Sequence, residues 1–390
     1  MSQTSNVKPI LSSAPGSQGT KAVELAVLGG GIIGLSIAYE CCRRGMKVTL
    51  LEKGKCGGQA TGAAAGMLAP YSEIGEDPDP FFDLCQLSLK LYPRWQEEIR
   101  TVSGLDFEYT QSGSLHLALH EADELALETR LQWQREWGVR GEIVRGKVLR
   151  ELEPHLTERA LAALYYPDEA HVYAPDYVVA LMEACRRAGV RIIEEAGDVQ
   201  FKEIRTDGVL LSTEKEGLFS AERCVVATGS WTGLFEKALG VRLPIFPIRG
   251  QICAYHKKEE EIRHIIFSSQ GYLLTKRNGT IVCGASEDIA GFDTSTTEQG
   301  ISRLVRISRQ LFPFLNEREP FHRWAGLRPA TQDGYPLLGA LDHLPHIILA
   351  SGHYRNGILL GPATAQVIGD LMEGKEPPVN LRFFDPLRFS

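Results

Sequence analysis

Hydrophobic and polar residues follow the rhythms of both strands and helices along this chain, most clearly near its N-terminal end. Residues 25–28 form a short apolar run, which predicts a buried strand. Residues 32–44 carry apolar positions at helical spacing without a proline, and Gly45 supplies a stop signal. Residues 47–51 then predict a second strand, which ends at Glu52. The order strand, helix, strand indicates the opening unit of an α/β fold.

The same helical spacing recurs along the rest of the chain. One of the later helices has a proline near its first residue and Gly189 directly after its last, which are the usual start and stop signals. The last helix follows a glycine-rich turn. Helices are expected at residues 80–102, 121–137, 175–188, 298–312 and 357–372.

Alternating patterns predict strands between these helices. Residues 106–119 read as a hairpin that turns at Ser112-Gly113, and residues 197–212 read as a second hairpin. The apolar run at 224–227 predicts a buried strand that runs into small residues. Parallel sheets offer a ligand crevice at the end of such strands.

A succession of short strands occupies residues 243–285. A hairpin turn is expected at Asn278-Gly279, with both residues supplying positive φ angles. A mainly antiparallel sheet therefore interrupts the parallel one, which implies a second domain built from insertions.

Three glycines, Gly29, Gly31 and Gly34, stand in the spacing G-x-G-x-x-G between the first strand and the first helix. In dinucleotide-binding folds these positions serve the sharp turn, the approach of the pyrophosphate, and the packing of helix on strand. Glu52 follows at the distance of the acid that accepts hydrogen bonds from a ribose, and its charge disfavours NADP. The pattern predicts a dinucleotide site rather than a purely structural turn, and it leaves NAD and FAD open.

The segment 53–70 contains few side chains larger than alanine. It is either a flexible linker or a loop whose backbone lies against a large flat ligand. Because it directly follows the ribose-binding acid and ends in apolar Met67-Leu68, we expect a loop that cradles the cofactor.

Composition narrows the function classes. The 390 residues are 43% hydrophobic and carry a net charge of -7, which argues against a nucleic-acid partner. No apolar run approaches the roughly eighteen residues that span a bilayer, so no integral membrane segment is expected. The eight cysteines form no C-x-x-C pair, so we expect no metal site, no redox dithiol and a cytoplasmic protein with reduced thiols. Residues 1–21 are rich in Ser, Gly, Thr and Pro, which predicts a disordered tail.

Three separated blocks carry a family resemblance. They are GGGIIGLSIAYE with Glu52, AAAGML at 63–68, and AGLRPATQDG at 325–334 together with GHYRNGILLGPAT at 352–364. Over residues 23–375 the chain resembles the D-amino-acid oxidase superfamily of flavoenzymes. Within it, the pattern is most similar to the glycine-oxidase branch that serves thiamine biosynthesis (the ThiO type).

The resemblance implies an α/β fold with two domains. A Rossmann-like FAD-binding domain (GR2 type) is expected beside a second, α+β substrate domain that contains a large antiparallel sheet. The FAD-binding domain is expected at 22–105, 172–235 and 323–375, and the substrate domain at 106–171 and 236–322, between tails at 1–21 and 376–390.

The resemblance also implies non-covalent FAD. Sarcosine oxidases hold flavin through a cysteine near the LRPAT block, whereas here no cysteine follows Cys283. The helix that begins near Gly357 would direct its positive end at the flavin and stabilise negative charge there. The residues expected to hold FAD are Gly29, Gly31, Ile32, Ile33, Gly34, Glu52, Lys53, Ala60, Thr61, Ala65, Gly66, Met67, Val199, His353, Tyr354, Arg355, Asn356, Gly357, Ile358 and Leu359.

Arg328, Arg355 and Tyr272 match the family's substrate-binding residues. A guanidinium fixes an amino-acid carboxylate with two parallel charge-assisted hydrogen bonds. Each residue also has a structural alternative. Arg328 would then form an ion pair, Arg355 would anchor the flavin turn, and Tyr272 would be a strand aromatic half in the core.

The activity implied by the resemblance is oxidative deamination of glycine, sarcosine or D-alanine. Hydride would pass from the substrate α-carbon to flavin N5, so no protein base is nominated. The imine would hydrolyse to glyoxylate or another α-keto acid and ammonia, and dioxygen would yield hydrogen peroxide. A role in forming the thiazole of thiamine and a homotetramer are expected with it. The alternatives are a D-amino-acid dehydrogenase that uses a quinone, a sarcosine oxidase-like enzyme, and a non-catalytic dinucleotide-binding protein.

Overall fold

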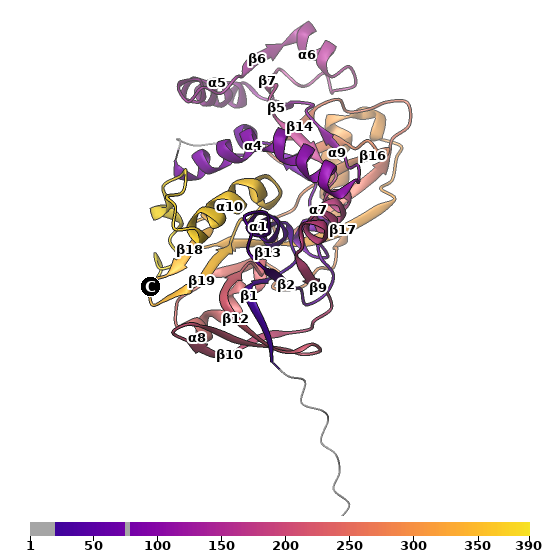
Figure 1. Cartoon of the computed structure of the whole chain (residues 1–390). Helices are drawn as coiled ribbons and strands as arrows, with labels where there is room; N and C mark the ends of the chain where they lie inside the picture. Colours follow the sequence, from indigo (N-terminus) through magenta and orange to yellow (C-terminus); the bar gives the residue numbers. More distant parts are fainter. Residues whose placement is uncertain (1–19, 75–78) are drawn as a thin grey trace, which may run out of the picture.

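The computed structural model describes residues 20–74 and 79–390, which two eight-stranded sheets and one three-stranded sheet organise (Figure 1). The expected N-terminal tail lies outside the described residues except for its last two positions. Lys21 already pairs with Phe219 in the first strand.

Five parallel strands form the centre of the first sheet. They are β1 (Lys21–Leu28), β2 (Val48–Leu51), β9 (Arg191–Ile193), β12 (Gly217–Val226) and β19 (Leu344–Ser351). In space they follow the order β9-β2-β1-β12-β19. This is the 3-2-1-4-5 order of a doubly wound fold, in which ligands bind where β1 and the fourth strand diverge.

Antiparallel strands extend this sheet. The hairpin of β10 (Val199–Arg205) and β11 (Gly208–Thr213) pairs with the first half of β12, as the alternation at 197–212 predicts. β18 (Leu337–Leu341) pairs with β19. β12 begins seven residues before the apolar run that predicts it. Its first half is only partly buried, so the apolar run marks its buried second half alone.

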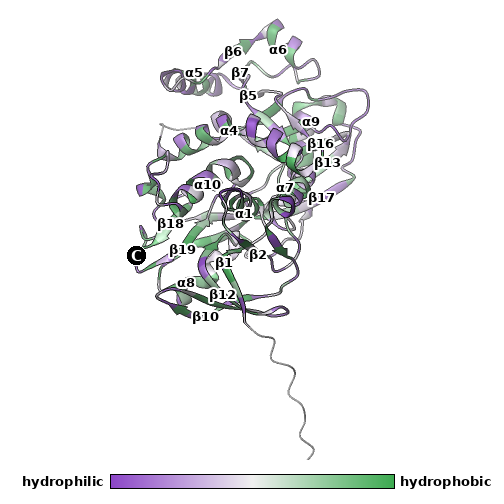
Figure 2. Ribbon diagram, in the orientation of Figure 1, coloured by the Kyte–Doolittle hydropathy of each residue, from purple (hydrophilic) through white to green (hydrophobic). Residues whose placement is uncertain are grey.

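Four helices pack against one another beside the parallel strands (Figure 1). They are α1 (Ile32–Arg43), α4 (Pro80–Ser103), α7 (Ala174–Ala188) and α10 (Gly357–Met372), all at predicted positions. Hydrophobic residues concentrate where these helices meet the sheet (Figure 2).

The second sheet is the large antiparallel one that the sequence predicts. Its order is β17-β13-β16-β15-β14-β5-β7-β6, and within this sheet, as far as the structure describes it, only the β14–β5 pair is parallel. The helix α9 (Glu298–Leu311) packs on this sheet and completes its core. The strands are β5 (Ser114–Ala118), β6 (Glu142–Arg145), β7 (Ala162–Tyr166), β13 (Ile245–His256), β14 (Ile265–Ser268), β15 (Gly271–Thr275), β16 (Thr280–Gly284) and β17 (His322–Thr331).

Smaller elements complete the described chain. A three-stranded sheet consists of β3 (Met67–Leu68), β8 (Ala170–Val172) and β4 (Tyr109–Thr110). The remaining helices are α2 (Ala60–Ala63), α3 (Pro70–Glu73), α5 (Glu121–Glu136), α6 (Gly146–Leu152), α8 (Glu236–Leu239) and the 3₁₀ turns η1 (Gly229–Phe235), η2 (Pro313–Leu315) and η3 (Leu381–Phe384).

Three expectations need correction. Residues 106–119 do not form a hairpin, because β4 pairs with β8 whereas β5 lies in the second sheet. Alternation reveals which face of a strand is buried, not which strand is its partner. At the 277–280 turn only Gly279 has a positive φ, of 82°. The segment 323–375 begins in β17, which pairs with β13, so its first residues belong to the second sheet.

None of the helices in the described ranges has an apolar stretch long enough to cross a membrane.

Candidate active site

A cavity of about 1480 Å³ lies between the carboxyl ends of β1 and β2 and the second sheet. Small-molecule pockets usually measure about 300–1000 Å³, so this cavity can hold more than one small ligand. Its lining unites residues that are far apart in the sequence, from Leu28 to Ile358.

Most residues predicted for the site line this cavity. Gly34, Asn356 and Leu359 are outside its lining. The first packs on the turn after β1, the second precedes α10, and the carbonyl of the third accepts a hydrogen bond from Ser88 Oγ. The predicted residues in the lining are Gly29, Gly31, Ile32, Ile33, Glu52, Lys53, Ala60, Thr61, Ala65, Gly66, Met67, Val199, Tyr272, Arg328, His353, Tyr354, Arg355, Gly357 and Ile358.

The glycines after β1 set the backbone at one end of the cavity. Gly29 has a φ of 103° and makes the turn out of the strand. A Cβ on Gly34 would lie 1.9 Å from the Gly29 carbonyl oxygen, so only glycine permits this contact of helix and strand. The helix α1 begins after Gly31, which has no side chain to cap it. Its first N–H, that of Ile32, donates to Thr61 Oγ1 at 3.0 Å, and the N–H groups that follow and the positive dipole end favour an anion.

Glu52 is held at the end of β2. Its two carboxylate oxygens accept hydrogen bonds from the backbone N–H groups of Gly30, at 2.7 Å, and Gly54, at 2.8 Å. The neighbouring Lys53 forms an exposed ion pair with Asp198 at 2.7 Å. The acid is therefore fixed by backbone donors at the edge of the cavity.

Two helices start side by side at the cavity. Gly357 at the start of α10 faces Ile32, and Gly361 one turn later faces Ser36 of α1. This close packing brings two positive helix ends to one cavity. Elsewhere in the lining, a Cβ on Gly66 would lie 2.1 Å from the Val172 carbonyl oxygen. Small residues and helix ends thus form a cradle that fits a flat, anionic dinucleotide such as FAD.

The turn before α10 is tied to β17. Burial lowers the pKa of His353 to about 3, so its imidazole is neutral. His353 Nε2 and Thr364 Oγ1 form a hydrogen bond of 3.0 Å. Tyr354 has a φ of 48°, which is uncommon for a residue with a side chain, and its N–H donates to the Pro329 carbonyl at 2.9 Å.

Arg328 on β17 lies half-buried in the cavity wall. Its Nη1 donates to the Ser286 carbonyl at 2.9 Å. Among residues 20–74 and 79–390 it forms no ion pair with a carboxylate. A Cβ on Gly250 would lie 2.4 Å from Arg328 Nη2, so the guanidinium rests on the bare backbone of β13.

Tyr272 on β15 is arranged in the same way. A Cβ on Gly284 would lie 2.4 Å from the Tyr272 hydroxyl. Burial raises the pKa of Tyr272, so its hydroxyl stays protonated and can donate a hydrogen bond. Sequence reasoning missed both Gly250 and Gly284. Glycine inside a strand signals a close approach, and that signal was present at both positions.

Arg355 differs from Arg328 because two carboxylates pair with it. Its Nε lies 3.2 Å from Glu73 Oε2 and its Nη1 lies 3.3 Å from Glu287 Oε1. The charge of Glu73 raises the pKa of Arg355, so the guanidinium stays protonated. These pairs fasten the turn before α10 to α3 and to the segment after β16.

Comparison with known proteins agrees with this geometry. Residues 24–371 match the family model of the FAD dependent oxidoreductases (DAO). The glycine oxidase of Geobacillus kaustophilus is 33% identical over 383 residues, which cover 95% of this chain and 98% of that protein. A bifunctional ThiO/ThiG protein of Synechocystis is 33% identical over 94% of this chain and 54% of its own length.

Solved structures agree as well. The crystal structure of the Geobacillus kaustophilus glycine oxidase superposes with a TM-score of 0.89 at 32% identity, covering 95% of this chain and 99% of that one. An L-proline dehydrogenase from P. horikoshii, at 22% identity and a TM-score of 0.84, shares the fold. By fold, by site geometry and by the family match over nearly its whole length, the chain belongs to the DAO family of FAD dependent oxidoreductases.

Proposed function

We propose that this protein is an FAD-dependent oxidase that deaminates glycine and other small amino acids or amines, such as sarcosine and D-alanine. The observation that carries the proposal is Arg328, a guanidinium free of carboxylate partners among the described residues, in one cavity with Tyr272 and the start of α10. The similarity to glycine oxidases along almost the whole chain supports the choice of substrate.

Arg328 would bind the substrate carboxylate. One of its donors is used by the Ser286 carbonyl, and this bond orients the guanidinium plane. The other donors can meet a carboxylate in a bidentate arrangement. The protonated hydroxyl of Tyr272 would add a third hydrogen bond. Binding at these groups holds the small substrate in one orientation, which is the protein's main contribution to the reaction.

The cofactor would be held without a covalent bond. The start of α1 would receive the pyrophosphate and Glu52 the ribose. Ala65, Gly66 and Met67 would follow the cofactor towards its ring, and the start of α10 would face that ring. When bound, FAD supplies the two-electron oxidant, and dioxygen restores it with release of hydrogen peroxide.

The chemistry balances with these groups. Glycine loses two electrons and two protons and becomes its imine, which water hydrolyses to glyoxylate and ammonia. The positive charge of Arg328 disfavours a second cation beside it, so the pocket favours the neutral amine that this oxidation requires. The carboxylates of Glu73 and Glu287 both pair with Arg355, which neutralises one of their two negative charges.

Oxygen consumption tests the proposal. FAD-loaded protein is mixed with glycine, and dioxygen, hydrogen peroxide, glyoxylate and ammonia are measured. Equal amounts of oxygen consumed and of each product formed are expected. If glycine or a D-amino acid is oxidised only when a quinone is added, the alternative of a dehydrogenase replaces the oxidase. If no amine is oxidised under either condition, the proposed function is wrong.

Finer features complete the proposal. Similarity to bifunctional ThiO/ThiG proteins supports a role in forming the thiazole of thiamine. Eight free thiols support a reducing, cytoplasmic location. We also propose an FAD-binding domain of residues 22–105, 172–235 and 332–375 beside a substrate domain of 106–171 and 236–331. The homotetramer rests on the family resemblance, and light scattering of the FAD-loaded protein tests it.

A further inference from the structure

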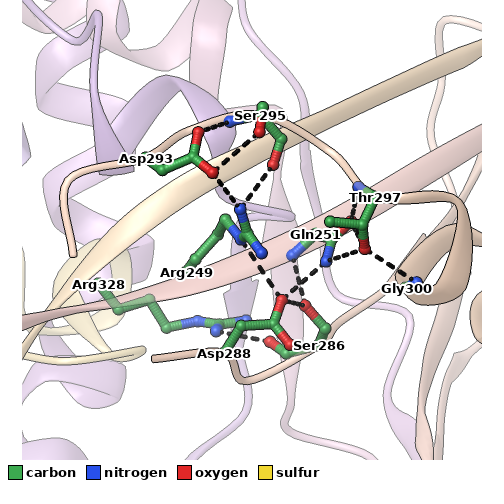
Figure 3. Close-up of polar contacts among 9 residues, drawn as sticks. All are labelled: Arg249, Gln251, Ser286, Asp288, Asp293, Ser295, Thr297, Gly300 and Arg328. Atoms are coloured by element: carbon green, nitrogen blue, oxygen red, sulfur yellow. Dashed lines mark hydrogen bonds and ion pairs between the residues drawn. The ribbon is translucent and has the colours of Figure 1, made fainter. Parts of the chain in front are cut away.

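The segment that follows β16 forms a polar network behind Arg328 (Figure 3). Its Ser286 supplies the carbonyl that accepts the hydrogen bond from Arg328 Nη1. The orientation of the guanidinium therefore depends on where the backbone of Ser286 is held. Neither the family match nor the proposed function says what holds it.

Asp288 is the centre of this network. Its Oδ2 accepts a hydrogen bond from Ser286 Oγ at 2.7 Å and another from Gln251 Nε2 at 2.7 Å. Its backbone N–H and carbonyl pair with the carbonyl and N–H of Arg249, both at 2.9 Å. One carboxylate oxygen and one backbone bridge thus fix the segment to β13.

Gln251 on β13 joins the network to the start of α9. Its backbone N–H donates to Ser286 Oγ at 3.0 Å, and its carbonyl accepts from the Ser286 N–H at 3.2 Å. Its Oε1 accepts from the N–H of Thr297, the residue that caps α9. Ser286 is therefore held from its backbone and from its side chain at once.

Charge favours the same arrangement. Arg249 is buried, and its Nε lies 3.5 Å from Asp288 Oδ2 while its Nη1 pairs with Asp293 at 2.7 Å. Burial raises the pKa of Asp288, but hydrogen bonds from Gln251 and Ser286 and the charge of Arg249 outweigh it and lower that pKa. Asp288 is therefore ionised at neutral pH, accepts hydrogen bonds from Ser286 Oγ and Gln251 Nε2, and forms an ion pair with Arg249.

We infer that Asp288 is a positioning residue for substrate-carboxylate binding, because it holds the Ser286 carbonyl that orients Arg328. The inference rests on the proposed function and deepens it. Asp288 acts through Ser286 and Arg328 and makes no contact with the substrate in this arrangement. Its loss should weaken carboxylate binding while leaving the cofactor end of the cavity intact.

The variants separate geometry from charge. Asp288→Ala removes both side-chain hydrogen bonds. Asp288→Asn keeps one oxygen that can accept from Ser286 and Gln251, because both bonds go to the same Oδ2. Asp293→Asn is the matched control, since Asp293 also pairs with Arg249 but bonds Ser295 rather than Ser286.

The test uses FAD-loaded proteins and two readouts. The first is KM and kcat for glycine. The second is the dissociation constant of glycolate, which has the same carboxylate as glycine. Glycolate binding is measured from the change in the visible flavin spectrum. For Asp288→Ala we expect KM and the glycolate constant to rise about tenfold, with kcat within about twofold. Asp288→Asn should remain within about threefold of the parent, and Asp293→Asn should be unchanged.

The outcomes are distinct. If Asp288→Ala keeps the parent KM and glycolate constant, or if Asp293→Asn loses as much as Asp288→Ala, the inference is wrong. If Asp288→Ala does not fold, Ser286→Ala replaces it, because it removes the two hydrogen bonds of Ser286 Oγ, with Asp288 and with the Gln251 N–H, and should raise both constants about threefold. Parent protein that is neither reduced by glycine nor able to bind glycolate would contradict the proposed function instead.

Discussion

The two ends of the cavity are built in different ways. At the end near β1, the elements come from one stretch of about thirty residues, and backbone groups make the contacts through Gly29, Gly34 and the start of α1. At the other end, side chains from separate strands converge. Arg328 comes from β17 and Tyr272 from β15, and the glycines beneath them come from β13 and β16.

The difference determines what each end can tolerate. A backbone site fails when a Cβ is added, because backbone atoms cannot move aside. A side-chain site loses function gradually, because the end of a flexible side chain can shift. We therefore expect substitutions near β1 to abolish cofactor binding and substitutions near β17 to change the kinetics of a protein that still holds FAD.

The largest expected effect comes from Gly34→Ala. Its Cβ would lie 1.9 Å from the Gly29 carbonyl oxygen. We expect destabilisation of about 3 kcal/mol and loss of bound FAD. Absorbance near 450 nm and urea unfolding measure both. Ser36→Ala on the same helix is the control, and it should keep FAD. A Gly34→Ala protein with full FAD content would refute the backbone account.

His353 gives the next effect, on stability against pH. Its pKa of about 3 lies below the unfolded value of 6.5, because the folded protein buries the neutral ring. The contribution of His353 to the free energy of unfolding is complete above pH 6.5. It falls as the pH drops towards 3, because the imidazole takes up a proton in the unfolded chain before it does so in the folded protein. Between pH 7 and pH 5 the loss should be about 2 kcal/mol from this group.

The comparison of the parent with His353→Gln isolates that contribution. Urea unfolding of both FAD-loaded proteins at the two pH values gives the difference of differences. The variant should lose about 2 kcal/mol less than the parent over the same interval. Equal losses would mean that the ring is protonated in the folded state as readily as in the unfolded one.

Gly250→Ala should act on substrate binding and leave FAD in place. The added Cβ would lie 2.4 Å from Arg328 Nη2, and the guanidinium must move away. We expect KM for glycine to rise about tenfold with little change in kcat. Steady-state oxygen uptake measures both constants. An unchanged KM would show that the position of the guanidinium does not matter.

Arg355→Lys should have the smallest effect. Its ion pairs with Glu73 and Glu287 involve a side chain that is 40% exposed, and solvent weakens such pairs. We expect a change of about threefold in kcat/KM for glycine, well below that of Arg328→Lys. The two variants are measured side by side. An equal or larger loss in Arg355→Lys would show that assigning the substrate carboxylate to Arg328 is wrong.

The sequence predicts the end near β1 well because its information is local. The spacing of Gly29, Gly31 and Gly34, the following helix and Glu52 are all set by neighbours in the chain. Four helices of the layer beside the sheet are predicted within about two residues for the same reason.

The other end depends on pairings that no short window contains. β4 and β5 do not pair with each other, since β4 pairs with β8 and β5 with β7, and β17 pairs with β13 in the second sheet. All of these pairings join segments that are distant in the sequence. Arg328 and Tyr272 are predicted as substrate-binding residues from the family resemblance. Their supports, Ser286 and Asp288, become evident only when β13 and β16 are seen together.

The most direct test of the account is anaerobic reduction of the flavin by glycine. FAD-loaded parent and Arg328→Met proteins are mixed with glycine without oxygen, and absorbance near 450 nm is followed. The parent flavin should bleach with glycine and recover its absorbance in air. The variant should keep its FAD and bleach at least about a hundredfold more slowly at low glycine concentration. Equal bleaching of the two proteins, or a parent that glycine does not reduce, would contradict the account.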